Sequence, residues 1–362
     1  LAFCAGEQQE ADEAAARQAW ERLADVGAEE SPEEASLSLC GFVQQLLCPE
    51  ANNMLAGRAE AERDLDEPLT SYYVATSHNS FLVGNQLTSR SSAAMYRRQL
   101  LQGLRSLEID CWDGSDGQPV VTHGNTLCSK VPFAEVIAAI AETAFARSTL
   151  PVVLSLENHC SLEQQGEMAR IMKAAFGSRL AAAEHVARCS PNALRGHVLL
   201  KAKTTTKVPK RKSRSRRSSS RNDGSAAEAG TRAVCQEFAE LIGLRSTPAK
   251  QFLVVEDDEQ DPAAGWGNRI SSLPEQDFVA VAKEGSRSPR LLLFQQICAV
   301  RLCRAYPSKW RTDSSNGDPL LAWRAGAQHV ALNLQTNDLG AQLHMAFFHA
   351  AAGSGSARRP PR

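Results

Sequence analysis

The chain has 362 residues, of which 43% are hydrophobic, and its 40 Lys and Arg nearly balance its 41 Asp and Glu. This hydrophobic content supports a packed core and excludes a wholly disordered chain. No apolar run approaches the ~20 residues of a membrane-spanning helix, so we expect no integral membrane protein. The chain opens Leu-Ala-Phe-Cys and turns acidic at once. We therefore expect no signal peptide, and a fragment or a processed start.

The net charge of −1 hides two segments of opposite sign. Residues 1–35 carry ten carboxylates and two Arg, whereas residues 207–221 carry eight Lys and Arg and no acid. The basic block indicates either an anionic partner, such as a membrane surface or nucleic acid, or a solvated linker whose charge is incidental. Ten cysteines are scattered without a two-residue spacing, which indicates reduced thiols in a cytosolic protein.

Composition divides the chain into four regions and a tail. We expect a helical region over 1–67, a flexible basic linker over 204–231 and a disordered tail over 349–362. The regions 68–203 and 232–348 alternate strand-like runs with amphipathic helices, which predicts a parallel α/β fold. Polar residues cluster where the strands end, as in a barrel whose active site lies at the carboxyl rim.

The expected elements follow from hydrophobic periodicity. Helices are predicted over 92–101, 133–145 and 162–176. Strands are predicted near 74–76, 107–110, 119–122, 151–157, 197–200, 291–294 and 329–334.

Three carboxylates gather at the predicted ends of two strands. Glu108 and Asp110 lie two residues apart and point the same way, and Glu157 ends the strand in LSLEN. Like charges at short range raise one another's pKa unless a positive group neutralises them. With Asn79 as a neutral oxygen donor, this set favours Ca²⁺ or Mg²⁺. The alternative is a set of surface acids on solvated strand ends.

Two histidines each follow a predicted strand directly, His78 in TSHN and His123 in THG. Imidazole titrates near neutrality, so a pair at two strand ends can serve as a general base and a general acid. A single histidine is more commonly an ordinary polar residue, so the argument depends on the pair and on the nearby carboxylates.

A set of cations ends two further strands. Lys201 and Lys203 share a face, and so do Arg304 and Tyr306. Paired lysines and an arginine suit an anionic, phosphorylated substrate. The alternative is a pair of ordinary lysines beside a linker.

Several of these segments, in order, closely resemble the two catalytic halves of eukaryotic phosphoinositide-specific phospholipase C. The resemblance covers roughly residues 68–348 and is interrupted at the linker, as in that family. The first half matches SHNSFLVGNQL (77–87), LEIDCWDG (107–114), PVVTHGNTL (119–127), PVVLSLENHCS (151–161) and HVLLKAK (197–203), and the second half matches CRAYPSKWRTDSSN (303–316) and WRAGAQHVALNLQT (323–336).

The resemblance implies a distorted TIM-type (β/α)8 barrel built from both halves, 68–203 and 232–348. It also implies a calcium-dependent hydrolysis of phosphatidylinositol 4,5-bisphosphate through a cyclic phosphodiester, which yields diacylglycerol and inositol 1,4,5-trisphosphate in intracellular signalling. His78 would stabilise the pentacoordinate transition state, and His123 would protonate the leaving diacylglycerol oxygen.

The resemblance also assigns ligands. One Ca²⁺ would be held by Asn79, Glu108, Asp110 and Glu157, and Glu108 or Glu157 would also act as the base on the inositol 2-hydroxyl.

Headgroup contacts follow in the same way. Lys201 and Lys203 match lysines that bind ring phosphates, Ser246 and Arg304 match a pair at the 4-phosphate, and Tyr306 would pack on the inositol ring.

A lipid substrate requires contact with an anionic membrane surface. Leu87, Leu127 and Trp310 match positions of the apolar ridge that enters the interface in the family, and Asn125 stands where this ridge usually has an aromatic residue. We therefore expect a monomeric cytoplasmic protein, peripheral at the inner face of the plasma membrane, that binds no nucleic acid.

The sequence departs from the family in several places. Residues 35–56 faintly resemble the end of the EF-hand region but lack a calcium loop, so no EF-hand site is expected. No segment of the given sequence resembles the family's pleckstrin-type or C-terminal β-sandwich domain, so we expect a fragment or a mis-spliced product. The glycine-tyrosine strand after residue 348 is replaced by AAAGSGSARRPP, and Gly317 replaces an aromatic residue. The linker is basic where many members have an acidic, inhibitory one.

Two alternatives remain open at this point. One is a catalytically inactive phosphoinositide-binding scaffold, against which the histidine pair and the calcium ligands argue. The other is a glycerophosphodiester phosphodiesterase, whose substrate has no ring phosphates for Lys201, Lys203, Ser246 and Arg304 to bind.

Overall fold

The computed structural model describes residues 65–181, 186–204, 206–207, 231–232, 234–247, 268–350 and 355–358. The EF-hand-like remnant expected within 1–67 and the basic block 207–221 lie almost entirely outside these residues. Within the described ranges, no helix is both long and apolar enough to cross a membrane.

Eight parallel strands close into a barrel, as predicted. They pair in the order β1, β12, β11, β10, β9, β6, β5 and β2, and β2 returns to β1 through the pair Thr76–Ser106. Four strands precede the linker and four follow it, so each half of the chain builds half of the barrel. The barrel strands are β1 (Tyr72–Ser77), β2 (Ser106–Trp112), β5 (Val152–Asn158), β6 (Val198–Ala202), β9 (Ile242–Thr247), β10 (Arg269–Pro274), β11 (Leu302–Tyr306) and β12 (His329–Leu332).

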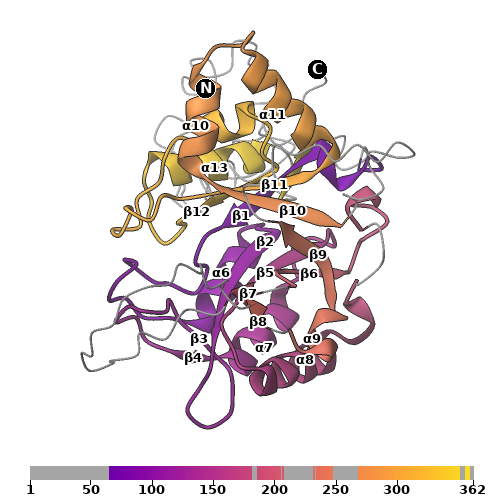
Figure 1. Cartoon of the computed structure of the whole chain (residues 1–362), viewed down its shortest axis with the longest axis vertical. Helices are drawn as coiled ribbons and strands as arrows, with labels where there is room; N and C mark the ends of the chain where they lie inside the picture. The colour runs from indigo at the N-terminus through magenta and orange to yellow at the C-terminus, as the bar shows by residue number, and fades with distance from the viewer. Residues whose placement is uncertain are drawn as a thin grey trace, which may run out of the picture.

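Helices cover the outside of the barrel. In Figure 1, α7 and α8 lie at the lower end with the first half, and α10, α11 and α13 lie at the upper end with the second. Ser92, Ser161 and Ser288 each cap a helix by accepting a bond from an N–H in its first turn. The helices are α6 (Ala93–Leu101), α7 (Phe133–Thr143), α8 (Leu162–Phe176), α9 (Gln236–Ala239), α10 (Glu275–Lys283), α11 (Pro289–Val300), α12 (Pro319–Arg324) and α13 (Leu339–Ala350), with single turns η1 (Leu69–Ser71), η2 (Gly177–Arg179) and η3 (Val186–Arg188).

Side chains of the barrel strands alternate between two separate apolar clusters. Leu107 and Ile109 of β2 are fully buried in the large cluster that joins the strands to the helices. A smaller cluster, which we call the floor, takes one residue from each of five strands, near the amino end of each. Its strand members are Val153, Leu199, Leu244, Ile270 and Leu302.

Two residues further along each of these strands, the same face becomes polar. Ser155, Lys201 and Arg304 are all buried although they carry hydroxyl or charged groups. Because side chains on a strand alternate, these residues lie inside the barrel, nearer the carboxyl ends than the floor. We call this level the polar layer; it comprises Glu108, Asp110, Ser155, Glu157, Lys201, Ser246, Ser272 and Arg304.

Two small antiparallel additions flank the barrel. The strand expected over 119–122 exists as β3 (Val120–Val121), but it pairs antiparallel with β2 and with β4 (Val131–Pro132), outside the barrel. The expected linker is bounded by a second pair, β7 (Thr206–Lys207) and β8 (Thr231–Arg232).

The prediction of a strand over 291–294 was wrong, because these residues belong to helix α11. Ser288 accepts a bond from the N–H of Leu291, and Pro289 occupies the first turn, which is a favourable helix start. Leu291 is buried while Leu292 is exposed. A run of four apolar residues could not reveal this division between faces.

The end of the chain also differs from the disordered tail expected over 349–362. Ser356–Arg358 form β13, which pairs antiparallel with the start of β1. Gly355 precedes it with a φ of +79°, and a Cβ at this position would lie 2.0 Å from the carbonyl oxygen of Gly103. The segment therefore does supply a strand after residue 348, and its glycine meets the need for a close approach.

Candidate active site

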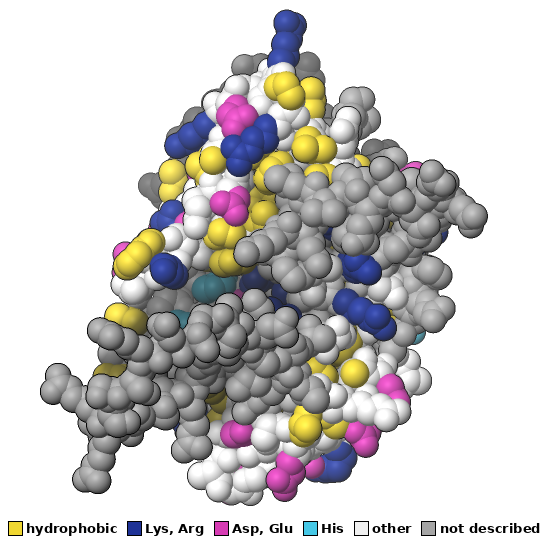
Figure 2. Space-filling view, viewed as in Figure 1, with side chains coloured by type: hydrophobic (Ala, Val, Ile, Leu, Met, Phe, Trp, Pro, Cys, Tyr) yellow, Lys and Arg dark blue, Asp and Glu magenta, His cyan; other side chains and the backbone are white. Residues whose placement is uncertain are grey.

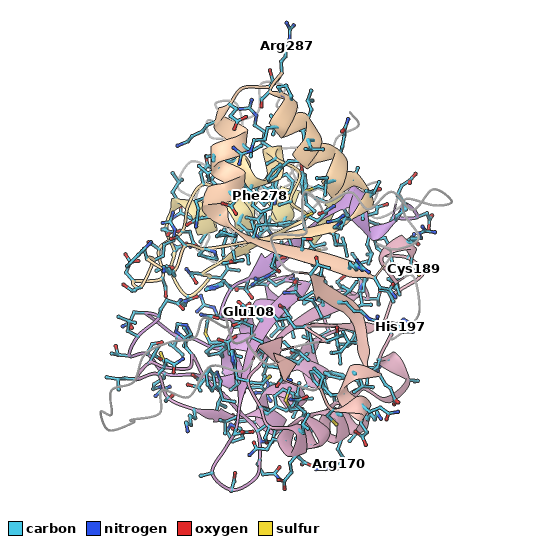
Figure 3. The ribbon with its side chains drawn as sticks, in the orientation of Figure 1. Glu108, Arg170, Cys189, His197, Phe278 and Arg287 are labelled. Atoms are coloured by element: carbon cyan, nitrogen blue, oxygen red, sulfur yellow. The ribbon has the colours of Figure 1, made fainter. Side chains whose placement is uncertain are left out.

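The chain leaves β1 in a tight turn that places His78 and Asn79 against β2. Asn79 has a φ of 41°, a left-handed conformation that asparagine tolerates. Its backbone N–H donates to Glu108 Oε2 at 3.0 Å, and His78 Nε2 lies 3.8 Å from the same oxygen. The turn thus joins both predicted residues to the carboxylate of Glu108, which lies near the centre of the molecule in Figure 3.

The tautomer of His78 is set by its other nitrogen. His78 Nδ1 lies 2.9 Å from Asn333 Oδ1, and an amide oxygen only accepts, so Nδ1 carries the proton. Burial lowers the pKa of His78, and the carboxylate of Glu108 opposes this change. The neutral imidazole therefore presents an unprotonated Nε2 to the site.

The three predicted carboxylates are brought together. Asp110 and Glu157 are direct partners in the register of β2 and β5, and Glu108 lies two residues before Asp110 on the same face. Burial, reinforced by Glu157 and Glu108, raises the pKa of Asp110 well above its ordinary value. Burial also acts to raise the pKa of Glu108, but Arg304 and His78 outweigh it, so the net change is downward.

Glu157 is the most exposed of the three carboxylates. His159 Nε2 lies 3.9 Å from Glu157 Oε2, and this imidazole, with further contributions from Lys203 and Lys201, lowers the pKa of Glu157 to about 2. The His159 ring in turn stacks on Trp112, with centroids 4.2 Å apart. His159 was not among the predicted site residues, although it lies two positions after Glu157.

These oxygen atoms fit a hard divalent cation by their chemistry. Asp110 Oδ1 is buried without a hydrogen-bond partner, and Asn79 Nδ2 donates to Gln86 at 2.7 Å, which leaves the Asn79 oxygen for a cation. Within the described part of the chain, no three His, Cys, Asp or Glu side chains are already gathered as a metal centre. The residues therefore support the donor set, without defining a coordination geometry.

Two buried cations face the carboxylates. Arg304 Nη2 lies 2.9 Å from Glu108 Oε1, and the Arg304 guanidinium lies 5.9 Å from the centre of the Tyr306 ring. Lys201 Nζ donates to Ser155 Oγ at 2.9 Å. Burial, reinforced by Arg304, lowers the pKa of Lys201 to about 7. Within the polar layer, Arg304 and Glu108 are therefore in contact and, like Lys201, buried away from water.

The remaining predicted headgroup residues lie around this centre. Lys203 is exposed just beyond β6, near enough to lower the pKa of Glu157. Ser246 is half-buried on β9. One strand, β10, separates it from Arg304 on β11.

His123 approaches from the hairpin outside the barrel. Thr122 N donates to Asp110 O at 3.2 Å, so His123 starts from the carboxyl end of β2. Its Nδ1 lies 2.6 Å from the carbonyl oxygen of Gln86, which only accepts, so Nδ1 carries the proton and Nε2 is left for chemistry. Figure 2 shows histidine and basic side chains together in a hollow between the two halves.

Three exposed apolar side chains lie beside His123. Leu87, Leu127 and Trp310 are 48%, 84% and 79% exposed. Leu127 N donates to Leu87 O at 2.8 Å, which sets their two loops side by side. Gln86 N donates to Thr312 O at 2.9 Å, which brings the loop of Trp310 to the same place. The three predicted ridge residues therefore share one side of the site.

Sequence reasoning missed two further polar residues of the site. Asn333 follows β12 directly, so the rule that selected His78 could have found it. Gln86 lies in an irregular loop, where no local pattern distinguishes it.

The matches to known proteins agree with this geometry. Two family models, "Phosphatidylinositol-specific phospholipase C, X domain" and the corresponding Y domain, match residues 65–204 and 242–362. The curated "1-phosphatidylinositol 4,5-bisphosphate phosphodiesterase delta-3-A" of Danio rerio is 36% identical over 82% of this chain and 39% of its own length. The delta-1 protein of Rattus norvegicus is 35% identical over 88% of this chain and 44% of its own length.

Solved structures of similar proteins also match this chain over most of its length. The crystal structure of S. officinalis PLC21 is 30% identical and superposes with a TM-score of 0.70, covering 96% of this chain and 44% of that one. The L. pealei PLC21 structure is 29% identical with the same TM-score.

The closed parallel barrel is split by a linker and has acids, histidines and buried cations at one end, which places the chain among TIM-type barrels with a polar site at the carboxyl rim. The two matched halves are more specific: the chain belongs to the eukaryotic phosphoinositide-specific phospholipase C family. It spans less than half the length of the curated relatives it matches.

Proposed function

We propose that the chain hydrolyses phosphatidylinositol 4,5-bisphosphate to diacylglycerol and inositol 1,4,5-trisphosphate in a calcium-dependent reaction. The proposal rests mainly on one observation. Two histidines with defined tautomers, three clustered carboxylates and two buried cations lie at the same end of one barrel. The printed names of the relatives, which are 4,5-bisphosphate phosphodiesterases, support the choice of substrate.

The reaction would begin at the substrate's own 2-hydroxyl. Its oxygen bonds to phosphorus while the bond from phosphorus to the diacylglycerol oxygen breaks. Glu108 or Glu157 would take the hydroxyl proton. His123, protonated on Nε2, would deliver a proton to the leaving diacylglycerol oxygen. Water would then bond to phosphorus while the bond from phosphorus to the 2-oxygen breaks; His123 would take a proton from the water, and the protonated carboxyl would return its proton to the 2-oxygen.

His78 would take a proton on Nε2 and then stabilise the charge that develops on the phosphoryl oxygens, since Asn333 and Glu108 hold its ring from two sides. When bound by Asn79, Glu108, Asp110 and Glu157, Ca²⁺ would lower the pKa of the 2-hydroxyl and neutralise equatorial oxygens. The orphaned Asp110 Oδ1 supports this assignment.

Recognition of the headgroup is assigned to the cations. Lys201 and Lys203 would bind ring phosphates, Arg304 and Ser246 would bind the 4-phosphate, and Tyr306 would pack on the ring. Arg304 and Lys201, which are buried beside acids, are suited to a polyanion, because the substrate's phosphates offset their desolvation.

The ridge of Leu87, Leu127 and Trp310 would enter the membrane interface, which makes the protein peripheral at the inner, anionic face of the plasma membrane. We also propose that the basic block 207–221 assists by binding acidic lipids. Deletion of this block should then weaken binding to anionic vesicles, and unchanged binding would contradict the idea.

One assay tests the activity: release of inositol trisphosphate from vesicles of phosphatidylinositol 4,5-bisphosphate, with and without a calcium chelator. We expect activity that the chelator abolishes. His123→Ala should lower kcat by about 10²–10⁴-fold. Arg170→Ala, a change on the exposed face of α8, serves as the control and should have no effect.

Activity that survives chelation, or survives His123→Ala, would contradict the mechanism. Tight binding of the headgroup without any turnover would instead favour the scaffold.

A further inference from the structure

Gln86 lies in the loop after β1 and is buried, with 6% of its surface exposed. Its side chain contacts residues from both halves of the chain. Oε1 accepts from Asn79 Nδ2 at 2.7 Å, and Nε2 donates to Asn333 Oδ1 at 3.1 Å and to Ser314 Oγ at 2.8 Å. Gln86 therefore contacts Asn79, whose backbone N–H binds Glu108, and Asn333, which binds His78.

The main chain of Gln86 extends the same network. Its carbonyl oxygen accepts from His123 Nδ1 at 2.6 Å, and its N–H donates to Thr312 O at 2.9 Å. One residue therefore holds His123 through its backbone and Asn79 and Asn333 through its side chain. Because Asn333 Oδ1 also accepts from His78 Nδ1, the two histidines are joined through Gln86 and Asn333.

The chemistry of these contacts requires an amide. Asn79 Nδ2 offers only hydrogens, so its partner must accept, whereas Asn333 Oδ1 offers only lone pairs, so its partner must donate. A carboxamide is the neutral side chain that does both from one planar group. A carboxylate of the same size can satisfy Asn79 but would face Asn333 Oδ1 with a second acceptor.

We propose that Gln86 is a positioning residue: its amide donates to Asn333 Oδ1, an arrangement compatible with the present tautomer of His78, and it directs the oxygen of Asn79 to the carboxylates. The importance of Gln86 for turnover rests on the proposed function. Its effect on the tautomer of His78 can be measured whether or not the proposed function is correct. Groups next to a reacting centre that orient its ligands commonly change activity by about 10–100-fold when altered.

Gln86→Glu tests the direction of the bonds. The introduced acceptor should turn the Asn333 amide so that Nδ2 faces both the new carboxylate and His78 Nδ1, at the cost of its present bond to Ser315 O at 3.2 Å. His78 Nδ1 would then accept, and the proton would move to Nε2. The His123 bond is made by the main chain, so His123 should keep its tautomer.

Gln86→Met tests the same site without this reversal. Methionine fills a similar volume but forms none of the three side-chain bonds. Asn333 Oδ1 should then keep its bond from His78, so the tautomer should be unchanged while Asn79 loses its support.

The experiment records the imidazole nitrogen resonances of the full chain by ¹⁵N NMR, since protonated and unprotonated ring nitrogens are well separated. Signals of His78 are assigned by their loss in His78→Gln. We expect Gln86→Glu to exchange the two nitrogen types of His78 and Gln86→Met to leave them unchanged. Both variants should lower kcat by about 10–100-fold with little change in KM.

Gln165→Glu is the matched control. Gln165 is also buried and also makes one accepting and one donating bond, to Cys235 N and Cys160 O, on α8. It should leave the His78 signals and kcat near the wild-type values.

Unchanged His78 signals in Gln86→Glu would overturn the inference, as would an equal loss of kcat in the Gln165→Glu control. If Gln86→Glu exchanges the His78 nitrogens but the wild-type protein shows no phospholipase activity, the positioning role is supported and the proposed function is refuted. If the wild-type protein is active but Gln86→Glu leaves the His78 signals unchanged, only the positioning role is refuted.

Discussion

The floor and the polar layer of the barrel are built by the same strands only two residues apart, yet they differ in their physical character. Floor residues such as Leu199 and Leu244 are apolar and fully buried. Lys201 and Arg304 are almost as deeply buried but are charged, at 6% and 4% exposure. Burial stabilises the fold at the floor and opposes it in the polar layer, so stability and chemistry are separated along each strand.

The largest expected effect on stability comes from the floor. Leu199→Ala should lower the free energy of unfolding by about 2–5 kcal/mol, because it removes a fully buried side chain and leaves a cavity. Urea denaturation measures this loss. Leu127→Ala is the matched control, since Leu127 is 84% exposed and its loss should change stability little. Equal effects of the two substitutions would remove the distinction between floor and surface.

Lys201→Met should raise the free energy of unfolding at low pH, whereas Leu199→Ala lowers it. The folded-state pKa of Lys201 is about 7, below the ordinary value of about 10.4, so the charged form destabilises the fold. This penalty is fully present below pH 7 and disappears as the pH rises from about 7 to about 10.4. The variant should therefore be more stable than wild type by about 2–4 kcal/mol at pH 6, and the two should converge near pH 10.5.

Urea unfolding across this pH range provides the measurement for Lys201→Met. Lys203→Met, at an exposed position two residues further along, is the matched control. A constant difference between Lys201→Met and wild type at all pH values would mean that charge burial is not the cause.

Asp110→Asn should give a smaller gain in stability. The raised folded-state pKa of Asp110 means that its charged form is disfavoured in the fold. The penalty appears as the pH rises from the ordinary value of about 3.9 through the folded-state pKa, and persists above it. With a chelator at pH 8, the variant should be more stable by roughly 1–3 kcal/mol, and it should lose the stabilisation that calcium gives to wild type.

Thermal unfolding with and without calcium tests the Asp110 prediction. Asp116→Asn, at an exposed position, is the control. If calcium still raised the melting temperature of Asp110→Asn by the wild-type amount, Asp110 would not be a ligand.

The smallest effect is expected outside the barrel, at the ridge. Trp310→Ala and Leu127→Ala should each weaken binding to lipid vesicles by roughly 10-fold, because each removes ~1.5 kcal/mol of apolar burial in the interface. Sedimentation with vesicles gives the binding constant. Val300→Ala, exposed at the far end of α11, should bind like wild type. Equal weakening by Val300→Ala would argue against a defined ridge.

Most of the barrel and its central site could be predicted because they follow local rules. Strands that alternate with helices close in a parallel order, and polar residues at strand ends meet at one rim, which is how Glu108, Asp110 and His78 were found. The tautomers of the histidines could not be predicted, because they depend on Asn333 and Gln86, which folding brings from 255 and 37 residues away.

Two expectations were wrong, and the reasons differ. The apolar run 291–294 fits a strand or a helix equally well, and only the cap at Ser288 and the division of its faces show α11. The segment around Gly355 contains few residues typical of strands, yet it pairs with β1 because its glycine fits against Gly103.

The β7–β8 pair has a consequence for engineering. By pairing Thr206 with Arg232 and Lys207 with Thr231, it holds the two ends of the intervening segment next to each other. A cut or an insertion between them would leave the β6–β9 and β1–β12 seams intact. We therefore expect the protein to work as two separately expressed fragments that reassemble, or as a host for a fluorescent reporter placed between these strands.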